Sequence, residues 1–342
     1  MLLVLFIATA LVFFVTRPKD TPAGLELAQP PAQSAPAAPL SQPTAASTVI
    51  KPISSVVVSS QTPAPTPTPG YFATTWTTAH PAIDVQGITA QGAIIVDRDS
   101  QQVLFDKNMN VRRSPASIMK LVTAMVALDL AKPEQTISVS RDAANMEPNR
   151  MGLDAGEQLT VQELMYGMLL DSGNDAAKAL ADGLPGGPQA FIQKMNDKAA
   201  SLGLRNSHFV DAAGLDDDNY TTPYDMAVLA DAALTGYPTI RTVVSTKQIT
   251  IPSTATHKTF QPTNLNDLLW DYPGTYGAKV GYTDAADYTI VLAAQKNGRN
   301  VLTVLMGSDH HFTEGKILLD WAFGHLPPAD LPPAPVKKFA AR

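Results

Sequence analysis

The 342-residue sequence contains no cysteine. This absence excludes a disulfide framework, a thiolate nucleophile and a cysteine-ligated zinc site. Basic residues are not in excess either, because 25 lysines and arginines stand against 31 aspartates and glutamates, a formal net charge of -6. The chain therefore has no overall basic surface, and its composition argues against a nucleic-acid partner.

Long hydrophobic runs are scarce, and the one example lies at the N-terminus. Residues 1–15 are uncharged and apolar over slightly less than the length of a membrane-spanning helix. No convincing cleavage site follows directly, so we expect residues 1–19 to be a retained membrane anchor rather than a cleaved signal segment. Arg17 and Lys19 follow the run, whereas an exported chain carries its cations before it, which indicates a start further upstream.

Composition then divides the rest of the chain. Residues 20–80 are rich in Pro, Ala, Ser and Thr and carry few charges, which predicts a disordered linker, and residues 327–342 form a Pro-rich tail. Regular patterning extends over residues 81–326, a length that fits one catalytic domain. We therefore expect a cell-membrane protein whose catalytic domain lies outside the cytoplasm, held by its N-terminal segment.

The domain combines strand and helix patterns. Residues 93–97 with 102–105 read as one hairpin, and residues 288–295 with 301–306 read as another around the turn Asn297-Gly298. Thr160 and Glu163 form a capping box, and Pro223 occupies a first helical position. Helical spacing also covers 176–184, 189–202 and 313–323. Strands at both ends with helices between them predict an α/β (α+β) domain in which helices cover an antiparallel sheet.

Three short motifs carry candidate chemistry. Ser117 and Lys120, at helical spacing near a predicted helix start, place a hydroxyl beside an amine, and free backbone N–H groups there favour an oxyanion. Ser172 and Asn174 flank a glycine after an apolar helix, and Lys279 precedes Val280-Gly281 just before a strand. Taken singly, each has an ordinary structural interpretation: a capped helix with a surface lysine, a helix-terminating turn, a strand edge.

The order and spacing of the motifs are more specific than the motifs themselves. Ser-x-x-Lys, Ser-x-Asn and Lys-x-Gly follow one another about 55 and then about 105 residues apart, as in penicillin-binding proteins and class A β-lactamases. Longer stretches, among them RRSPASIMKLVTAMVAL and NRMGLDAGEQLTVQELMYGMLLDSGNDAA, resemble the low-molecular-mass D-Ala-D-Ala carboxypeptidases. The resemblance covers residues 92–324 and implies the β-lactamase/transpeptidase-like fold.

The resemblance also implies roles for individual residues. Ser117 corresponds to the acylated nucleophile and Lys120 to its general base, while Ser172, Asn174 and Lys279 correspond to the groups that shuttle protons and position substrate. Family members remove the terminal D-alanine of peptidoglycan pentapeptides and are acylated by β-lactam antibiotics, with no metal or cofactor. The resemblance places the substrate beside Val280, Gly281, Tyr282, Thr283 and His311, with the N–H groups of Ser117 and Tyr282 as the oxyanion hole.

Three positions depart from the family pattern. Val280 stands where a threonine usually contacts the substrate carboxylate, His311 stands where an arginine usually does, and Asp287 replaces a glycine. A histidine beside a carboxylate would help more when protonated, toward about pH 6. Two alternatives to a carboxypeptidase follow: a weak or non-catalytic wall-binding relative, and a β-lactamase, which the absence of a Glu-x-x-x-Asn segment between the second and third motifs disfavours.

Two further clusters suggest metal sites but lack the necessary partners. His310 and His311 have no third ligand at a fitting spacing. The acidic run 216–218 lacks the glycine and the distal glutamate of an EF-hand loop. We therefore predict no metal site.

Overall fold

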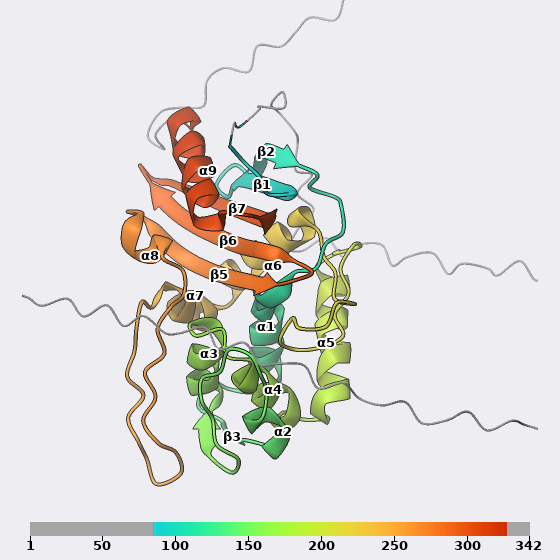
Figure 1. The fold of residues 1–342 in the computed structure, drawn as a ribbon, viewed down its shortest axis with the longest axis vertical. Helices are drawn as coiled ribbons and strands as arrows, with labels where there is room; N and C mark the ends of the chain where they lie inside the picture. The colour runs from blue at the N-terminus through green and yellow to red at the C-terminus, as the bar shows by residue number, and fades with distance from the viewer. Residues whose placement is uncertain (1–84, 86, 327–342) are drawn as a thin grey trace, which may run out of the picture. The chain divides into compact units, whose positions relative to one another are not determined.

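The structure, a computed structural model, describes residue 85 and residues 87–326 (Figure 1). The predicted anchor at 1–19, the linker at 20–80 and the tail at 327–342 lie outside the described residues. Within the described part of the chain, no helix is both long enough and apolar enough to cross a membrane.

An antiparallel five-stranded sheet with the order β2-β1-β7-β6-β5 forms the upper part of the molecule in Figure 1. Its strands are β1 (Gly92–Asp97), β2 (Gln102–Lys107), β5 (Thr275–Thr283), β6 (Asp287–Lys296) and β7 (Arg299–Ser308). Strands β3 (Thr136–Ser138) and β4 (Gln158–Thr160) pair separately. Both predicted hairpins are present, and Asn297 and Gly298 have positive φ at the β6–β7 turn, as the Asn-Gly pair predicts.

The helices lie mostly between the N-terminal and C-terminal strands of the sheet. They are the 3₁₀ turn η1 (Ala116–Met119), α1 (Lys120–Leu130), α2 (Arg141–Ala144), α3 (Val161–Leu169), α4 (Asn174–Gly183), α5 (Gly187–Ser201), α6 (Pro223–Gly236), α7 (Pro238–Ser245), α8 (Leu268–Asp271) and α9 (His311–His325). The capping box of Thr160 and Glu163 is formed at the start of α3, and Pro223 begins α6. The helices predicted from 176, 189 and 313 correspond to α4, α5 and α9.

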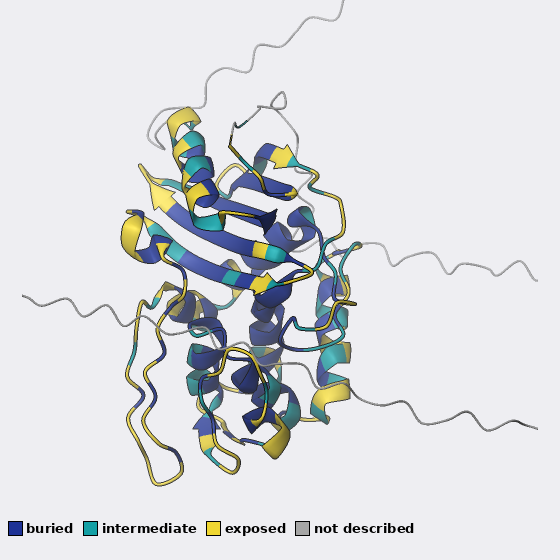
Figure 2. Cartoon of the chain, viewed as in Figure 1, coloured by how far each residue is buried: buried dark blue, intermediate teal, exposed yellow. Residues whose placement is uncertain are grey.

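Two apolar layers hold these elements together. One lies between the sheet and the helices α1 and α3–α7, and the other lies between the opposite face of the sheet and α9. Figure 2 shows the consequence: the middle of the sheet and the helices below it are buried, while the exposed residues gather at loops and at the outer surface of α9. The sheet is therefore covered on both faces, and β5 is its edge on the side of η1.

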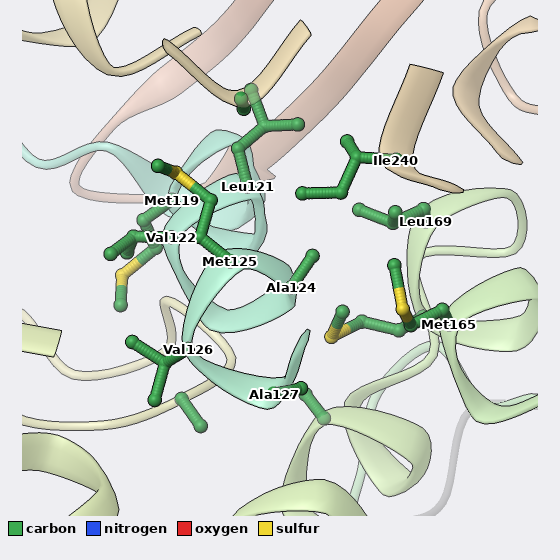
Figure 3. Close-up of a cluster of buried hydrophobic side chains, with 14 of the residues drawn as sticks. Met119, Leu121, Val122, Ala124, Met125, Val126, Ala127, Met165, Leu169 and Ile240 are labelled. Atoms are coloured by element: carbon green, nitrogen blue, oxygen red, sulfur yellow. The ribbon is translucent and has the colours of Figure 1, made fainter. Parts of the chain in front are cut away.

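Helix α1 is the centre of the helical layer. Its residues from Lys120 through Ala127 are all buried, so the helix is enclosed on every side rather than amphipathic. Figure 3 shows Met165 and Leu169 of α3 and Ile240 of α7 together on one side of its apolar side chains. Close packing around α1 holds the helix in place, and with it the turn η1 that directly precedes it.

Candidate active site

Ser117 lies in η1, directly before α1. In a 3₁₀ turn, residues three apart eclipse one another, so Ser117 and Lys120 project from the same side. The Nζ of Lys120 donates a hydrogen bond to Ser117 Oγ at 2.6 Å. Ser117 retains 8% exposure, whereas Lys120 retains none. The nucleophile candidate is therefore largely buried but keeps a small contact with solvent, while its partner amine is fully shielded.

Three acceptors surround the Nζ of Lys120. They are Ser117 Oγ, Asn174 Oδ1 at 2.8 Å and the backbone oxygen of Ala213 at 2.9 Å. The two carbonyl oxygens can only accept hydrogen bonds, and a neutral amine has two N–H groups and one lone pair. With its N–H groups on Asn174 and Ala213, neutral Lys120 directs that lone pair at the hydroxyl of Ser117. This arrangement suits proton transfer from the serine to the lysine.

Electrostatics favour that neutral form. Burial lowers the pKa of Lys120 well below its ordinary value, and the positive charge of Lys279 lowers it further, against the charges of Asp211 and Asp175, which raise it. A lysine without solvent loses the hydration that stabilises its ammonium. A larger fraction of Lys120 is therefore unprotonated at neutral pH than an exposed lysine would be.

The second motif lies where α3 gives way to α4. Asn174 begins α4, and its Nδ2 donates to the backbone oxygen of Pro148, which fixes the orientation in which Oδ1 faces Lys120. Ser172 is buried, with φ at 60°. Among the described residues, no hydrogen bond joins its hydroxyl to Ser117 or Lys120. Its role as a proton relay therefore stays a prediction.

The third motif lies before β6, as the sequence pattern predicted, and itself forms part of β5, a strand that the pattern did not predict. Lys279 is 1% exposed, and burial lowers its pKa to about 7, against the charge of Asp171, which raises it. Its Nζ donates to the backbone oxygen of Val280 at 2.9 Å. The lysine thus adds positive potential to the site from the edge strand of the sheet.

Gly281 brings the backbone of β5 against the nucleophile. A Cβ on this residue would lie 2.7 Å from the backbone nitrogen of Ser117, a separation that only a glycine avoids. The next strand also contacts η1, because the hydroxyl of Thr289 donates to the backbone oxygen of Pro115 at 3.1 Å. This close approach puts the edge of β5 against Ser117, and the oxyanion hole formed by the N–H groups of Ser117 and Tyr282 stays a prediction.

Two carboxylates that sequence reasoning missed shape the loops of the site. Asp175 is fully buried and accepts hydrogen bonds from the backbone N–H groups of Met151, Gly152 and Leu153. Asp211 accepts from the N–H groups of Ala213, Gly214, Leu215 and Asp216, and this turn presents the oxygen of Ala213 to Lys120. An aspartate three residues before a glycine is a turn signal that could have located Asp211.

A cavity of about 310 Å³ adjoins this turn. It is lined by Met146, Lys178, Asp211, Ala212, Ala213, Leu215 and Asp216. Lys178 stands one helical turn after Asn174 on α4, and Ala213 is the residue whose oxygen contacts Lys120. The cavity therefore lies beside the turn that presents the oxygen of Ala213 to Lys120.

The residues predicted to hold the substrate lie along the end of β5. Val280 packs against the apolar layer under α9, and Tyr282 is 52% exposed. The hydroxyl of Thr283 accepts a hydrogen bond from the N–H of Ala286 at 3.1 Å, so it closes the β5–β6 turn. Asp287 adopts φ of 52°, in the left-handed region that favours glycine, and accepts from Nε2 of Gln91 at 3.3 Å.

His311 is the first residue of α9, and its ring stacks on Tyr288 at a centroid distance of 4.6 Å with 12° between the planes. Burial lowers the pKa of His311 to about 4, although the charge of Glu314 raises it. Without substrate, burial therefore favours the neutral imidazole at pH 6. The sequence-based expectation that a protonated His311 helps near that pH concerns a histidine beside a substrate carboxylate, which would raise this pKa, so it stays a prediction.

Comparison with known proteins agrees with this geometry. The family model for D-alanyl-D-alanine carboxypeptidases, Peptidase_S11, matches residues 76–310. The D-alanyl-D-alanine carboxypeptidase DacF of Bacillus subtilis is 35% identical over 243 residues, which cover 68% of this chain and 62% of that protein. DacB2 of Mycobacterium tuberculosis is 35% identical over 251 residues, 71% of this chain and 85% of the relative.

Solved structures show the same fold. The DD-transpeptidase of Streptomyces K15 superposes with a TM-score of 0.66 at 30% identity, covering 69% of this chain and 98% of that one. An evolved penicillin-binding protein homolog from Mycobacterium tuberculosis superposes with a TM-score of 0.68 at 33% identity, covering 75% and 99%. The predicted α+β fold is confirmed, and the chain belongs to the D-alanyl-D-alanine carboxypeptidase family Peptidase_S11.

Proposed function

We propose that this chain is a serine-type D-Ala-D-Ala carboxypeptidase that acts on peptidoglycan pentapeptides through an acyl-enzyme on Ser117 and is acylated by β-lactams at the same residue. The observation that supports this most directly is the 2.6 Å hydrogen bond between Lys120 Nζ and Ser117 Oγ, with the other two acceptors of Lys120 fixed. The family relationship supports the choice of substrate.

In the acylation step, the proton of Ser117 passes to the lone pair of Lys120 while Oγ attacks the carbonyl carbon of the penultimate D-alanine. The tetrahedral oxyanion receives hydrogen bonds from the backbone N–H groups of Ser117 and Tyr282. The C–N bond then breaks, and the leaving nitrogen takes the proton that the serine lost. Lys279 supports this step by holding down the pKa of Lys120.

In the deacylation step, water takes the place of the leaving amine. Its proton passes to the same amine of Lys120 as its oxygen attacks the ester carbonyl, and the ester C–O bond breaks to release the shortened peptide. Ser117 Oγ recovers its proton from Lys120. The cycle consumes one water and returns both side chains to their starting states.

Covalent labelling tests this function. After incubation with a penicillin, the intact mass of the wild type should rise by one penicillin, and the Ser117→Ala variant should show no increase. Loss of this hydroxyl should change the free energy of unfolding by only about 1 kcal/mol, so thermal unfolding checks that the variant is folded. Ser253→Ala is the control, because Ser253 lies exposed in a loop. Equal labelling of Ser117→Ala and wild type would disprove the nucleophile assignment.

A second candidate function is that of a weakly active or inactive wall-binding relative. Two departures from the family pattern favour it: Val280 in β5 has no hydroxyl, and burial lowers the pKa of His311, at the start of α9, to about 4. Both candidates predict binding to peptidoglycan, but an inactive relative predicts no covalent adduct, and a weakly active one predicts an adduct with slow release of D-alanine. The mass measurement therefore identifies an inactive relative, and the rate of D-alanine release separates a weakly active relative from an efficient carboxypeptidase.

We also propose that residues 1–19 anchor the protein in the cell membrane with the catalytic domain outside the cytoplasm. The uncharged apolar run at residues 1–15 and the Pro/Ser/Thr-rich segment after it support this location. The full chain should stay in the membrane fraction after a high-salt wash and should be digested by protease added to spheroplasts. Recovery in the soluble fraction, or full protection from protease, would contradict the proposal.

A further inference from the structure

Asp171 lies in the loop between α3 and α4, directly before the second motif. The N–H of Thr263 donates to its Oδ1 at 2.8 Å. Further along the same segment, Nδ2 of Asn266 donates to the backbone oxygen of Gly277 at 3.4 Å, two residues before Lys279 in β5. The segment from Thr263 to Asn266 therefore joins the loop of Asp171 to the strand that carries Lys279.

Asp171 and Lys279 act on each other as opposite charges across this junction. Burial lowers the pKa of Lys279 to about 7, and the charge of Asp171 opposes that fall. Burial and the charge of Asp175 raise the pKa of Asp171, whereas the N–H of Thr263 and the charge of Lys279 lower it. A donor and a cation beside a carboxylate both stabilise its ionised form. Asp171 is therefore the counter-ion of Lys279.

The two buried lysines of the site have different acidic neighbours. Besides burial, the charge of Lys279 lowers the pKa of Lys120, while the charges of Asp211 and Asp175 raise it. Among the described residues, the groups that act on Lys120 do not include Asp171, which acts on Lys279 instead. Two buried ammonium groups repel each other, so the lysines titrate as a pair that holds one proton more readily than two. Asp171 favours the state in which Lys279 holds that proton.

We propose that Asp171 is a positioning residue that keeps this proton on Lys279, so that Lys120 stays neutral and can accept the proton of Ser117. This role rests on the proposed function. Asp171 acts only through Lys279 and does not contact the reacting atoms. Without its charge the ammonium of Lys279 is less stable, so Lys279 should lose its proton at lower pH. The alkaline side of the pH profile of acylation therefore depends on Asp171, and the acid side depends on Lys120.

The pH dependence of penicillin acylation in Asp171→Asn tests this role. Asparagine keeps an oxygen that accepts the N–H of Thr263, so the substitution removes the charge and leaves the contact. The second-order rate of labelling with a fluorescent penicillin is measured between about pH 5 and 10. We expect the pH above which the rate falls to become lower by about half to one unit, so that the rate beyond it is roughly threefold to tenfold below wild type. The pH below which the rate falls should not change, because Asp171 does not act on Lys120.

Asp99→Asn is the matched control. Asp99 also accepts a backbone N–H at 2.8 Å, from Asn300, but it lies beside the β6–β7 turn, at the other end of the sheet from Gly281. This variant should reproduce the wild-type profile. Asp171→Ser, a second neutral variant that keeps an acceptor, should show the same change as Asp171→Asn, and Asp171→Glu should bring the alkaline side back toward that of wild type. Thermal unfolding checks that each variant is folded.

Two results would overturn the role of Asp171. One is a profile of Asp171→Asn that coincides with wild type. The other is a rate lowered equally at every pH, which would show that Asp171 only holds Thr263 in place. In either case acylation of the wild type at Ser117 would leave the proposed function standing. A wild type that penicillin does not acylate would contradict both the function and the role of Asp171.

Discussion

Gly281→Ala is the substitution whose effect follows most directly from the geometry of the site. The added Cβ would lie 2.7 Å from the backbone nitrogen of Ser117 and 2.7 Å from Thr289 Oγ1. Neither neighbour can easily move, because one is backbone and the other is fully buried and hydrogen-bonded to Pro115. Ordinary contacts begin at 3.4 Å, so β5 and η1 must separate by about 0.7 Å.

That separation acts on the nucleophile and on the oxyanion hole together. Misplacing reacting groups by about 1 Å costs about 10²-fold in rate, and losing one oxyanion donor costs about 10²- to 10³-fold. We therefore expect Gly281→Ala to lower the second-order rate of penicillin acylation by about 10²-fold. Overpacking should also lower the free energy of unfolding by about 1 to 3 kcal/mol.

Time-resolved labelling with a fluorescent penicillin measures the rate, and thermal unfolding measures the stability. Gly324→Ala in α9 is the control, because among the described residues no atom outside its own helix backbone lies within 4 Å of its added Cβ. It should acylate at the wild-type rate and gain about 0.5 to 1 kcal/mol, as alanine replaces glycine in a helix. If Gly281→Ala acylates as fast as wild type with an unchanged Tm, β5 does not approach Ser117 as described and the reasoning fails.

Four further outcomes follow from the same contacts. Lys279→Gln removes the positive charge that lowers the pKa of Lys120, so that pKa should rise. Only neutral Lys120 accepts the serine proton, so the pH below which penicillin acylation slows should become higher, and an unchanged pH profile would contradict the coupling. Asp175→Ala removes the buried acceptor of three loop N–H groups and should lower the free energy of unfolding, measured in urea, by about 2 to 4 kcal/mol. Asp217→Ala, at an exposed position, should change that free energy by less than about 0.5 kcal/mol, and equal effects of the two substitutions would show that Asp175 does not hold the loop. Val280→Thr with His311→Arg should raise kcat/KM for release of D-alanine from a D-Ala-D-Ala peptide by up to about 10²-fold. An unchanged value would show that these positions do not limit substrate recognition. Because burial lowers the pKa of His311 to about 4, His311→Asn should leave the pH dependence of D-alanine release unchanged between about pH 5 and 8, and a lost limb in that range would show that His311 titrates there.

Local sequence determined the elements whose signals lie within a few residues of one another. The capping box from Thr160 to Glu163, the proline at the start of α6 and the Asn297-Gly298 turn each place a backbone feature through contacts across three or four residues, and all three are present. The pairing of Ser117 with Lys120 belongs to the same class, because three residues of helical turn suffice to bring hydroxyl and amine together.

Only the tertiary structure decided the surroundings of that pair. Asn174 and Ala213 complete the shell of Lys120 from 54 and 93 residues away, and their approach depends on packing around α1 rather than on any local pattern. The same holds for β5, whose placement against η1 depends on the whole sheet, and for Tyr282, Tyr288 and His311, which come together from three elements. Burial also lowers the pKa of Lys120 and of His311, because desolvation is a property of the folded core and not of the residue type.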